Sequence, residues 1–327
     1  MAQRATKWLT ALSQRISQSH EKRARQRVRG ILLLFHEVHD DDDQYMREFK
    51  TGCTAAFLDA IIIWLCRHHW DFIPLEQVMS RLERDDVGRR FAVFTFDDGY
   101  RNTVTRALPI LARYNAPFTV YAPTGAITRE LPSWWLGLRQ LFQNHNAISV
   151  DAMATAFDCR DIAAKINAHT RVKHWVKQDY RRATALAETF RAYGISLPAL
   201  NHTYFMDEGA LQSLACHPLA NIGAHSQSHR ALSILGDVEV KQEMVQNKRF
   251  LEVLLDRPVG HFAYPYGIFG DREVALAAAT GFQTAVTTES EFVSQRHGMA
   301  PHQLPRIEFS GTTSHLDYCI DVLCRIQ

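Results

Sequence analysis

Short, unbroken apolar runs recur along this chain of 327 residues and constrain its fold more than any other feature. The clearest runs are residues 30–35 and 91–96, and both end in polar residues. Such runs are typical of strands that are covered on both faces. Further strands are expected in five segments, residues 72–75, 117–121, 221–224, 261–264 and 283–286. Apolar residues at helical spacing predict helices between them, at residues 57–65, 75–82, 103–114, 237–255 and 271–280. This alternation predicts an α/β fold with a parallel sheet, either open or closed into a barrel.

Residues 127–201 interrupt the alternation, because they are helical in pattern and contain no clear strand. We expect a helical insertion over one end of the sheet, where insertions commonly shape a substrate pocket. The chain is therefore divided into a basic N-terminal arm, residues 1–29, and one domain, residues 30–327, that contains the insertion.

The charge balance and the cysteines bear on partners and location. The formal charge is +2 with both signs mixed along the chain, so no nucleic-acid partner is expected. The six cysteines form no Cys-x-x-Cys pair and are interpreted as reduced thiols. The arm has Lys and Arg throughout and no unbroken apolar core, so it does not resemble a secretory signal. A cytoplasmic location is the expectation.

The arm allows two interpretations. Trp8, Leu9, Leu12 and Ile16 would form an apolar stripe on a helix, and a basic run ending at Arg29 follows them. Such a segment can lie on an anionic membrane surface, which would place the protein at the inner face of the membrane. Alternatively, the arm is a solvated end whose apolar residues dock on the domain.

Two adjacent acids, Asp97 and Asp98, follow the predicted strand 91–96 and precede Gly99. The carboxyl ends of strands are where α/β folds place reactive groups. Adjacent carboxylates repel each other, so the pair makes chemical sense if one holds a cation while the other takes a proton. Alone, however, an Asp-Asp-Gly sequence is a common surface turn.

Two histidines, His225 and His229, follow another predicted strand. Four residues apart, their imidazoles can face the same side of a helical turn, which is a frequent half of a metal site. No Glu follows the first His, so this is not the pattern of zinc proteases. One Asp with two His would leave a coordination position open for water activation. The same ligands occur in 2-His-1-carboxylate iron oxygenases, but those have no use for a second carboxylate.

With these residues in view, the chain resembles the polysaccharide deacetylase family, also called carbohydrate esterase family 4 or the NodB-homology domain. The first family motif, Thr-Phe-Asp-Asp-Gly, is matched at residues 95–99, and the second, His-Ser/Thr-x-x-His, at residues 225–229. The resemblance covers roughly residues 30–310 and implies a distorted (β/α)7 barrel. It also implies that Asp97 is the general base. A divalent metal would be held by Asp98, His225 and His229, with zinc as the default and cobalt or nickel as alternatives.

The third family motif departs from the pattern. It usually begins with Arg and ends in Pro-Tyr, whereas here Pro265 and Tyr266 are kept and Ala263 stands where the Arg is expected. By similarity, the backbone N–H of Tyr266 would stabilise the oxyanion, a role that survives the change. We propose Arg306 as the replacement that orients the catalytic Asp, with an ordinary surface ion pair as the alternative.

The departing amine needs a proton, and the usual C-terminal His motif has no clear match; His302 and His315 are the nearest candidates. Residues 34–38 resemble the Tyr-His segment of poly-N-acetylglucosamine deacetylases, so His36 is the expected general acid. A structural His is the alternative. Trp134 and Trp135, near the start of the insertion, would either stack on a sugar or pack in the core.

The resemblance thus implies a hydrolase of linear amide C–N bonds that removes an N-acyl group, here taken as acetyl, from an amino sugar. The substrate would be a polysaccharide or its biosynthetic intermediate. Two alternatives stay open: a catalytically inactive sugar-binding member of a polysaccharide assembly pathway, or a deacylase of a lipid-linked sugar.

Overall fold

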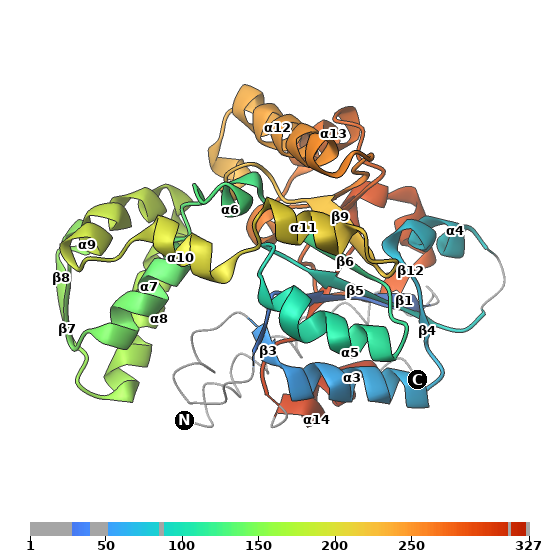
Figure 1. Cartoon of the computed structure of the whole chain (residues 1–327), viewed down its shortest axis with the longest axis horizontal. Coiled ribbons are helices and arrows are strands. Elements are labelled where there is room, and N and C mark those ends of the chain that lie inside the picture. Colours follow the sequence, from blue (N-terminus) through green and yellow to red (C-terminus); the bar gives the residue numbers. More distant parts are fainter. Residues whose placement is uncertain (1–27, 40–51, 85–87, 313–314, 325–327) are drawn as a thin grey trace.

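Parallel strands form a curled sheet with helices on its outer side (Figure 1). The computed structural model describes residues 28–39, 52–84, 88–312 and 315–324. The parallel strands of the barrel wall are β1 (Val28–Phe35), β5 (Phe91–Phe96), β6 (Phe118–Ala122), β9 (Ala220–Ala224), β10 (His261–Ala263), β11 (Thr284–Val286) and β13 (Ile307–Glu308). They adjoin in the order β11-β10-β9-β6-β5-β1, and β13 pairs with β1. The sequence prediction of a parallel α/β sheet is confirmed.

The sheet closes into a ring through Leu304, just before β13. Val286 and Leu304 form an isolated parallel bridge. Around it, the Leu304 N–H donates to the Ala285 carbonyl at 3.0 Å, and the Thr287 N–H donates to the Leu304 carbonyl at 2.9 Å. The segment that leads into β13 therefore contacts β11 on one side and β1 on the other. This confirms the distorted (β/α)7 barrel, with its weakest closure between β11 and β13.

Short strands complete the sheets. β4 (Asp71–Phe72) pairs with the start of β5, and β12 (Val293–Ser294) runs antiparallel to the start of β1. β2 (Glu37–His39) and β3 (Gly52–Thr54) form a separate parallel pair. β4 overlaps the strand expected at residues 72–75 only at Phe72, so that strand is shorter than predicted. β2, β3 and β12, of two or three residues each, carry too little pattern to be predicted from sequence.

Helices surround the barrel: α3 (Ala55–Arg67), α4 (Val78–Glu83), α5 (Leu108–Arg113), α11 (Glu208–Ala215), α12 (Asp237–Leu255), α13 (Asp271–Ala279) and α14 (Leu316–Cys324). A π-helical turn, η2 (Thr103–Ala107), precedes α5. 3₁₀ turns also connect barrel or insertion elements: η1 (Leu75–Gln77), η3 (Asp151–Met153), η5 (Leu232–Ile234), η6 (Pro265–Gly267), η7 (Gln295–Met299) and η8 (Pro301–Gln303). α3 shows why they form: the Thr54 hydroxyl caps its first turn, and its apolar stripe is buried on the sheet.

The barrel interior is a packed core. Leu32, Val93, Tyr121 and Leu304 are buried together inside the ring. A Cβ at Gly223 would lie 2.4 Å from the Tyr121 ring, so glycine at this position makes room for the aromatic side chain. Because the interior is filled, chemistry is confined to the rim of the barrel.

The insertion forms a lobe beside the barrel, drawn in green to yellow in Figure 1. After α6 (Thr124–Ile127) it comprises α7 (Trp134–Asn144), β7 (Ala147–Val150), β8 (Thr155–Asp158), α8 (Ile162–Gln178), η4 (Tyr180–Ala185), α9 (Leu186–Ala192) and α10 (Leu197–Tyr204). It has its own apolar core around Leu138, Leu141 and Phe142. The expectation that it contains no strand was wrong, because β7 and β8 pair as an antiparallel hairpin. In β7 exposed and buried residues alternate, but over only four residues, which is too short to distinguish from a loop.

No helix in the described parts of the chain is long and apolar enough to cross a membrane. The apolar stripe of the N-terminal arm, from Trp8 to Ile16, lies outside the described residues.

Candidate active site

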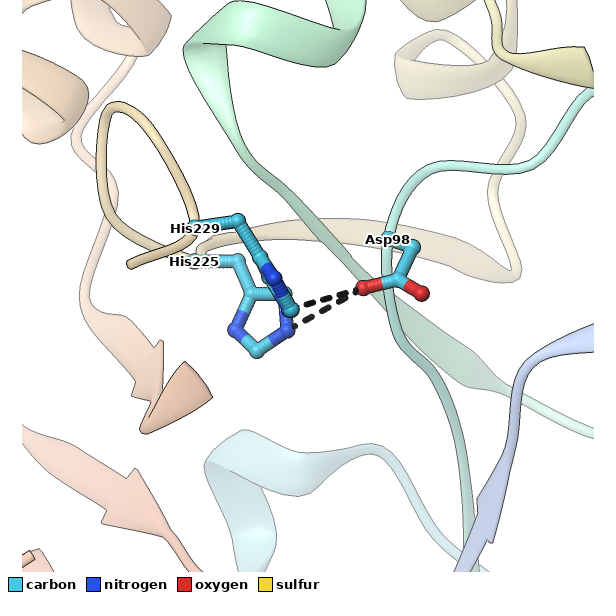
Figure 2. A group of neighbouring side chains, drawn as sticks. All are labelled: Asp98, His225 and His229. Atoms are coloured by element: carbon cyan, nitrogen blue, oxygen red, sulfur yellow. Dashed lines mark ion pairs between the residues drawn. The ribbon is translucent and has the colours of Figure 1, made fainter. Parts of the chain in front are cut away.

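Polar residues from four strand ends meet at one rim of the barrel. His36 follows β1, Asp97 and Asp98 follow β5, His225 follows β9, and Tyr266 lies just beyond β10. The carboxyl ends of parallel strands share one edge, which explains why residues so far apart in sequence converge. Figure 2 shows Asp98, His225 and His229 pointing toward one another.

The Asp98 carboxylate and the two imidazoles have the spacing of metal ligands. Asp98 Oδ1 lies 3.4 Å from His225 Nε2 and 3.1 Å from His229 Nε2, and all three side chains are buried. Within the described residues, this oxygen accepts no hydrogen bond. Oxygen and nitrogen ligands at about 2.1 Å from a tetrahedral cation are about 3.4 Å apart. This spacing, and a buried carboxylate oxygen that accepts no hydrogen bond, both fit a divalent cation.

Within this triad, the pKa of each residue is shifted by at least one of the other two. Burial raises the pKa of Asp98, but His229, His225 and His36 more than offset it and hold that pKa well below its usual range. Burial lowers the pKa of His225, yet Asp97 and Asp98 raise it above its ordinary value. At His229, burial prevails and the pKa is lowered. An ionised Asp98 beside a neutral His229 is a suitable ligand set for a cation.

The two histidines do not share a helical turn, and that sequence prediction was wrong. The chain between them turns through left-handed backbone, with φ of 63° at Ser226 and 54° at His229. The Ser226 hydroxyl closes the turn by accepting from the His229 N–H at 3.0 Å. Asp98 has a φ of 70° as well. Such conformations are costly for residues other than glycine and concentrate at functional sites.

A second layer of polar groups holds His225. Its Nδ1 donates to the Ala263 carbonyl at 2.8 Å, which leaves Nε2 as the ligand atom. Its backbone N–H donates to Asn247 Oδ1 at 2.7 Å. The Asn247 amide in turn donates to the Ala122 carbonyl at 3.1 Å and the Thr124 hydroxyl at 2.9 Å. Asn247 thus ties α12 to the rim at β6 and β9.

Sequence reasoning missed Asn247, although a signal existed. On α12 it lies at helical spacing among the buried Val240, Met244 and Leu251, and its side chain is fully buried. Glu243 on the same helix is also buried and accepts from the Ser228 N–H at 2.8 Å. A polar residue within an apolar stripe indicates a specific buried partner.

Arg306 donates hydrogen bonds to both carboxylate oxygens of Asp97 through its two terminal guanidinium nitrogens. Nη1 donates to Oδ1 and Nη2 to Oδ2, each at 2.7 Å. Arg306 also donates to the Thr287 carbonyl at 2.9 Å and the Thr95 hydroxyl at 3.1 Å. Its side chain is 0% exposed, so it is not a surface ion pair. Burial raises the pKa of Asp97, but Arg306, His225 and His36 together lower it, so this carboxylate is ionised at neutral pH.

Ala263, where the family pattern has arginine, is fully buried in the barrel interior. The Arg306 guanidinium lies over the Tyr121 ring at 5.4 Å, in the same interior cluster. An arginine at position 263 would have to share this interior with Arg306.

Of the three histidines considered as general acid, His36 lies beside the acids. It is half-buried, and its imidazole is among the causes that lower the pKa of Asp97 and Asp98. The ring of His302 instead bonds the Phe282 carbonyl at 2.8 Å, toward the amino end of β11. His315 Nδ1 accepts from the Thr312 N–H at 3.2 Å.

Aromatic side chains from the insertion and from η6 flank the candidate metal ligands. The Tyr266 ring lies 4.6 Å from that of His229, and its hydroxyl accepts from Trp134 Nε1 at 2.9 Å. The half-buried Trp135 lies 5.1 Å from His229 and donates to the Tyr100 hydroxyl at 2.8 Å. Both tryptophans therefore contact the rim, and neither packs only within the insertion.

The fold and the rim residues together define an α/β barrel with a candidate metal centre. The model of the polysaccharide deacetylase family matches residues 84–285, more than half of the chain. The protein belongs to the polysaccharide deacetylase family. The family model and a curated relative are both named for deacetylation.

Known proteins agree with this assignment. YxkH of Bacillus subtilis (strain 168), named as a polysaccharide deacetylase, is 26% identical over 112 residues, which are 34% of this chain and 39% of that protein. The match thus spans about two-fifths of the curated relative.

Solved structures share the fold. The deacetylase PplD of Streptococcus pyogenes, in complex with acetate, is 16% identical with a TM-score of 0.58, over 86% of this chain and 93% of that one. IcaB of Ammonifex degensii is 13% identical with a TM-score of 0.59, over 90% and 97%. The BpsB deacetylase domain of Bordetella bronchiseptica is 16% identical with a TM-score of 0.51, over 87% and 97%.

Proposed function

We propose that this protein is a metal-dependent hydrolase that removes an N-acetyl group from an amino sugar of a polysaccharide or of its biosynthetic intermediate. The main evidence is the buried triad of Asp98, His225 and His229 beside Asp97, whose two carboxylate oxygens both accept hydrogen bonds from Arg306. The triad provides ligands, while Asp97 stays outside the ligand set as a separate base. The family assignment supports this division of roles.

Asp97 is proposed as the general base. A divalent cation at the triad supplies, when bound, a Lewis acid that makes water nucleophilic near neutral pH. Asp97 is ionised and fixed in place, so it can accept the proton of the attacking water. Arg306 orients this carboxylate and limits its motion. Zinc is our proposed cation, with cobalt and nickel as alternatives for the same ligands.

Two further roles are assigned to Tyr266 and His36: stabilisation of the oxyanion and protonation of the leaving amine. The backbone N–H of Tyr266 would donate to the oxygen that gains negative charge as the acyl carbon is attacked. His36, next to the acids at the end of β1, would give its proton to the amine as the C–N bond breaks. The aromatic rings around His229 would border the sugar.

Acetate release from a panel of N-acetylated saccharides tests this function. The panel should vary chain length and carrier, and each reaction should be run after chelation and after metal add-back. We expect acetate only with metal-loaded protein. If loaded protein bound the glycans but released no acetate from any of them, the inactive sugar-binding alternative would replace the enzyme.

A lipid-linked amino sugar is the second candidate substrate, and the basic arm favours it. In this version the protein is cytoplasmic and works at the inner face of the membrane. Deletion of residues 1–29 should then reduce both membrane fractionation and activity on a lipid-linked acceptor, without changing activity on a soluble one. Identical behaviour of the shortened and full chains would remove this proposal.

A further inference from the structure

A buried ion pair next to the active site has no role in the chemistry described so far. Arg139 of α7 pairs with Glu37, the residue that follows His36; their side chains are 2% and 1% exposed. Nη1 donates to Oε2 at 3.2 Å, and Nη2 donates to Oε1. The pair joins the insertion to β2 across 102 residues of sequence.

Fold stability alone is a poor reason for such a pair. Both charges lose their hydration, and apolar residues of similar volume often fill such a site equally well or better. The pair does, however, fix geometry, because a bidentate contact between two planar groups sets both distance and orientation.

His36 lies between two fixed neighbours. On one side, the Phe35 carbonyl accepts from the Asp97 N–H at 2.9 Å, which ties the end of β1 to the base. On the other side, Glu37 is held by Arg139. The position of the His36 backbone thus depends on the barrel before it and on the insertion after it.

The helix that carries Arg139 also reaches the metal side of the centre. Trp135 and Arg139 are four residues apart, so they lie on one face of α7 about 6 Å apart along its axis. Trp135 contacts His229 and the Tyr100 hydroxyl, and Arg139 contacts Glu37. One helix face therefore contacts His229 at one end and Glu37, the residue after His36, at the other.

We propose that Arg139 is a positioning residue: through Glu37 it places the His36 imidazole for proton transfer to the departing amine. Helix α7 thereby sets the spacing between the metal side and the acid side of the centre. This inference rests on the proposed function, since it concerns how the same site expels its leaving group.

The nature of the leaving group separates positioning from general support. In amide hydrolysis water attacks the acyl carbon, the C–N bond breaks, and His36 supplies the proton that the amine needs. In hydrolysis of a 4-nitrophenyl acetate ester, the C–O bond breaks and the phenolate leaves without that proton. Both reactions use Asp97 and the metal ligands, but only the first depends on His36.

The test variant is Glu37→Met/Arg139→Met, which removes both charges and leaves an apolar pair of similar length. Its control is Asp71→Met/Arg81→Met, a partly exposed ion pair of 3.0 Å at the opposite end of β5, which controls for removal of a charge pair far from the site. We expect kcat for amide hydrolysis to fall about 10–100-fold, at or below the lower end of the roughly 10²–10⁴-fold that a general acid contributes, because the acid is displaced but not removed. Ester hydrolysis by the same variant should stay within about twofold of wild type, as should both reactions of the control. His36→Ala should show the same amide-selective loss.

If circular dichroism shows that the double variant does not fold, Arg139→Lys provides a second test of the positioning role. Lysine keeps the charge but not the bidentate contact, so amide hydrolysis should again fall more than ester hydrolysis. Equal loss of both reactions, or loss of neither, would overturn the positioning role. A wild-type protein that releases no acetate from any N-acetylated saccharide would instead overturn the proposed function.

Discussion

At the scale of single residues, two neighbouring carboxylates carry different partners. Asp98 has left-handed backbone and approaches the two imidazoles, whereas Asp97 is held by Arg306. Their separate environments keep both ionised although they are adjacent and buried.

Arg306→Met should damage both activity and stability. It leaves the buried Asp97 charge without its main partner, a change that costs about 3–5 kcal/mol in comparable buried pairs. We also expect kcat/KM for amide hydrolysis to fall about 10²-fold, because the base loses its orientation. Urea unfolding and acetate assays measure the two effects. Arg306→Lys should fall between the variant and wild type; full activity in Arg306→Met would show that Asp97 needs no such partner.

The metal-free protein should lose stability on acidification, partly through Asp97. Its pKa in the folded protein is below the unfolded value of about 3.9, so its stabilising contribution is present above that pH and lost as pH falls below it. In Arg306→Met the folded pKa of Asp97 rises, and this part of the acid dependence should shrink. Unfolding free energies between about pH 5 and 3 test this expectation. Parallel curves for both proteins would rule it out.

The candidate site residues differ in how far sequence could predict them. Asp97, Asp98, His225 and His229 belong to short local motifs, so their types and spacing were visible. Arg306 lies 209 residues from Asp97, and only the missing family arginine pointed to it. The Glu37 and Arg139 pair had no such signal, because it depends on how the insertion docks.

At the scale of elements, α7 is the part of the insertion that reaches the active site. Its place is set by close packing at Gly137, where a Cβ would lie 2.7 Å from the Phe190 ring of α9 and 3.0 Å from Leu197 of α10. Sequence predicted helices here but not their docking, since helical periodicity reports a buried face without naming the surface that covers it.

Gly137→Ala should therefore destabilise the protein by about 1–2 kcal/mol, because the added methyl group overpacks α7 against α9. Amide hydrolysis should fall as well, since α7 carries Trp135 and Arg139. Gly209→Ala on α11 is the matched control, because its nearest neighbour would be 3.8 Å away. Thermal unfolding and amide-hydrolysis kinetics of both variants test this prediction. Equal stability of the two variants would show that the packing around Gly137 accommodates a methyl group.

At the scale of the whole molecule, the candidate metal centre brings together segments that follow separate strands. Asp98 follows β5 and His225 follows β9, whereas the barrel itself closes through a single bridge at Leu304. Alternating strands and helices predicted a parallel sheet, either open or closed, and only the family resemblance implied the barrel. The pattern of residues did not show how the barrel closes, because β13 has only two residues and its pairing is set by the curl of the sheet.

Cation binding should accordingly stabilise the folded chain. A ligand at one hundred times its dissociation constant adds about 2.7 kcal/mol to the free energy of unfolding. Chelation should lower the Tm and zinc add-back should restore it, whereas His229→Ala should show neither change. If neither chelation nor zinc addition changed the Tm of wild type, a cation site at the triad would be contradicted.

The most direct measurement combines metal content and acetate release on the same samples of wild type and Asp97→Asn. With Asp98, His225 and His229 intact, both proteins should retain the cation. Wild type should release acetate from an N-acetylated saccharide, and Asp97→Asn should be at least about 10²-fold slower, as expected for loss of a general base. Acetate release at the wild-type rate by Asp97→Asn, or by metal-free wild type, would contradict the proposed mechanism.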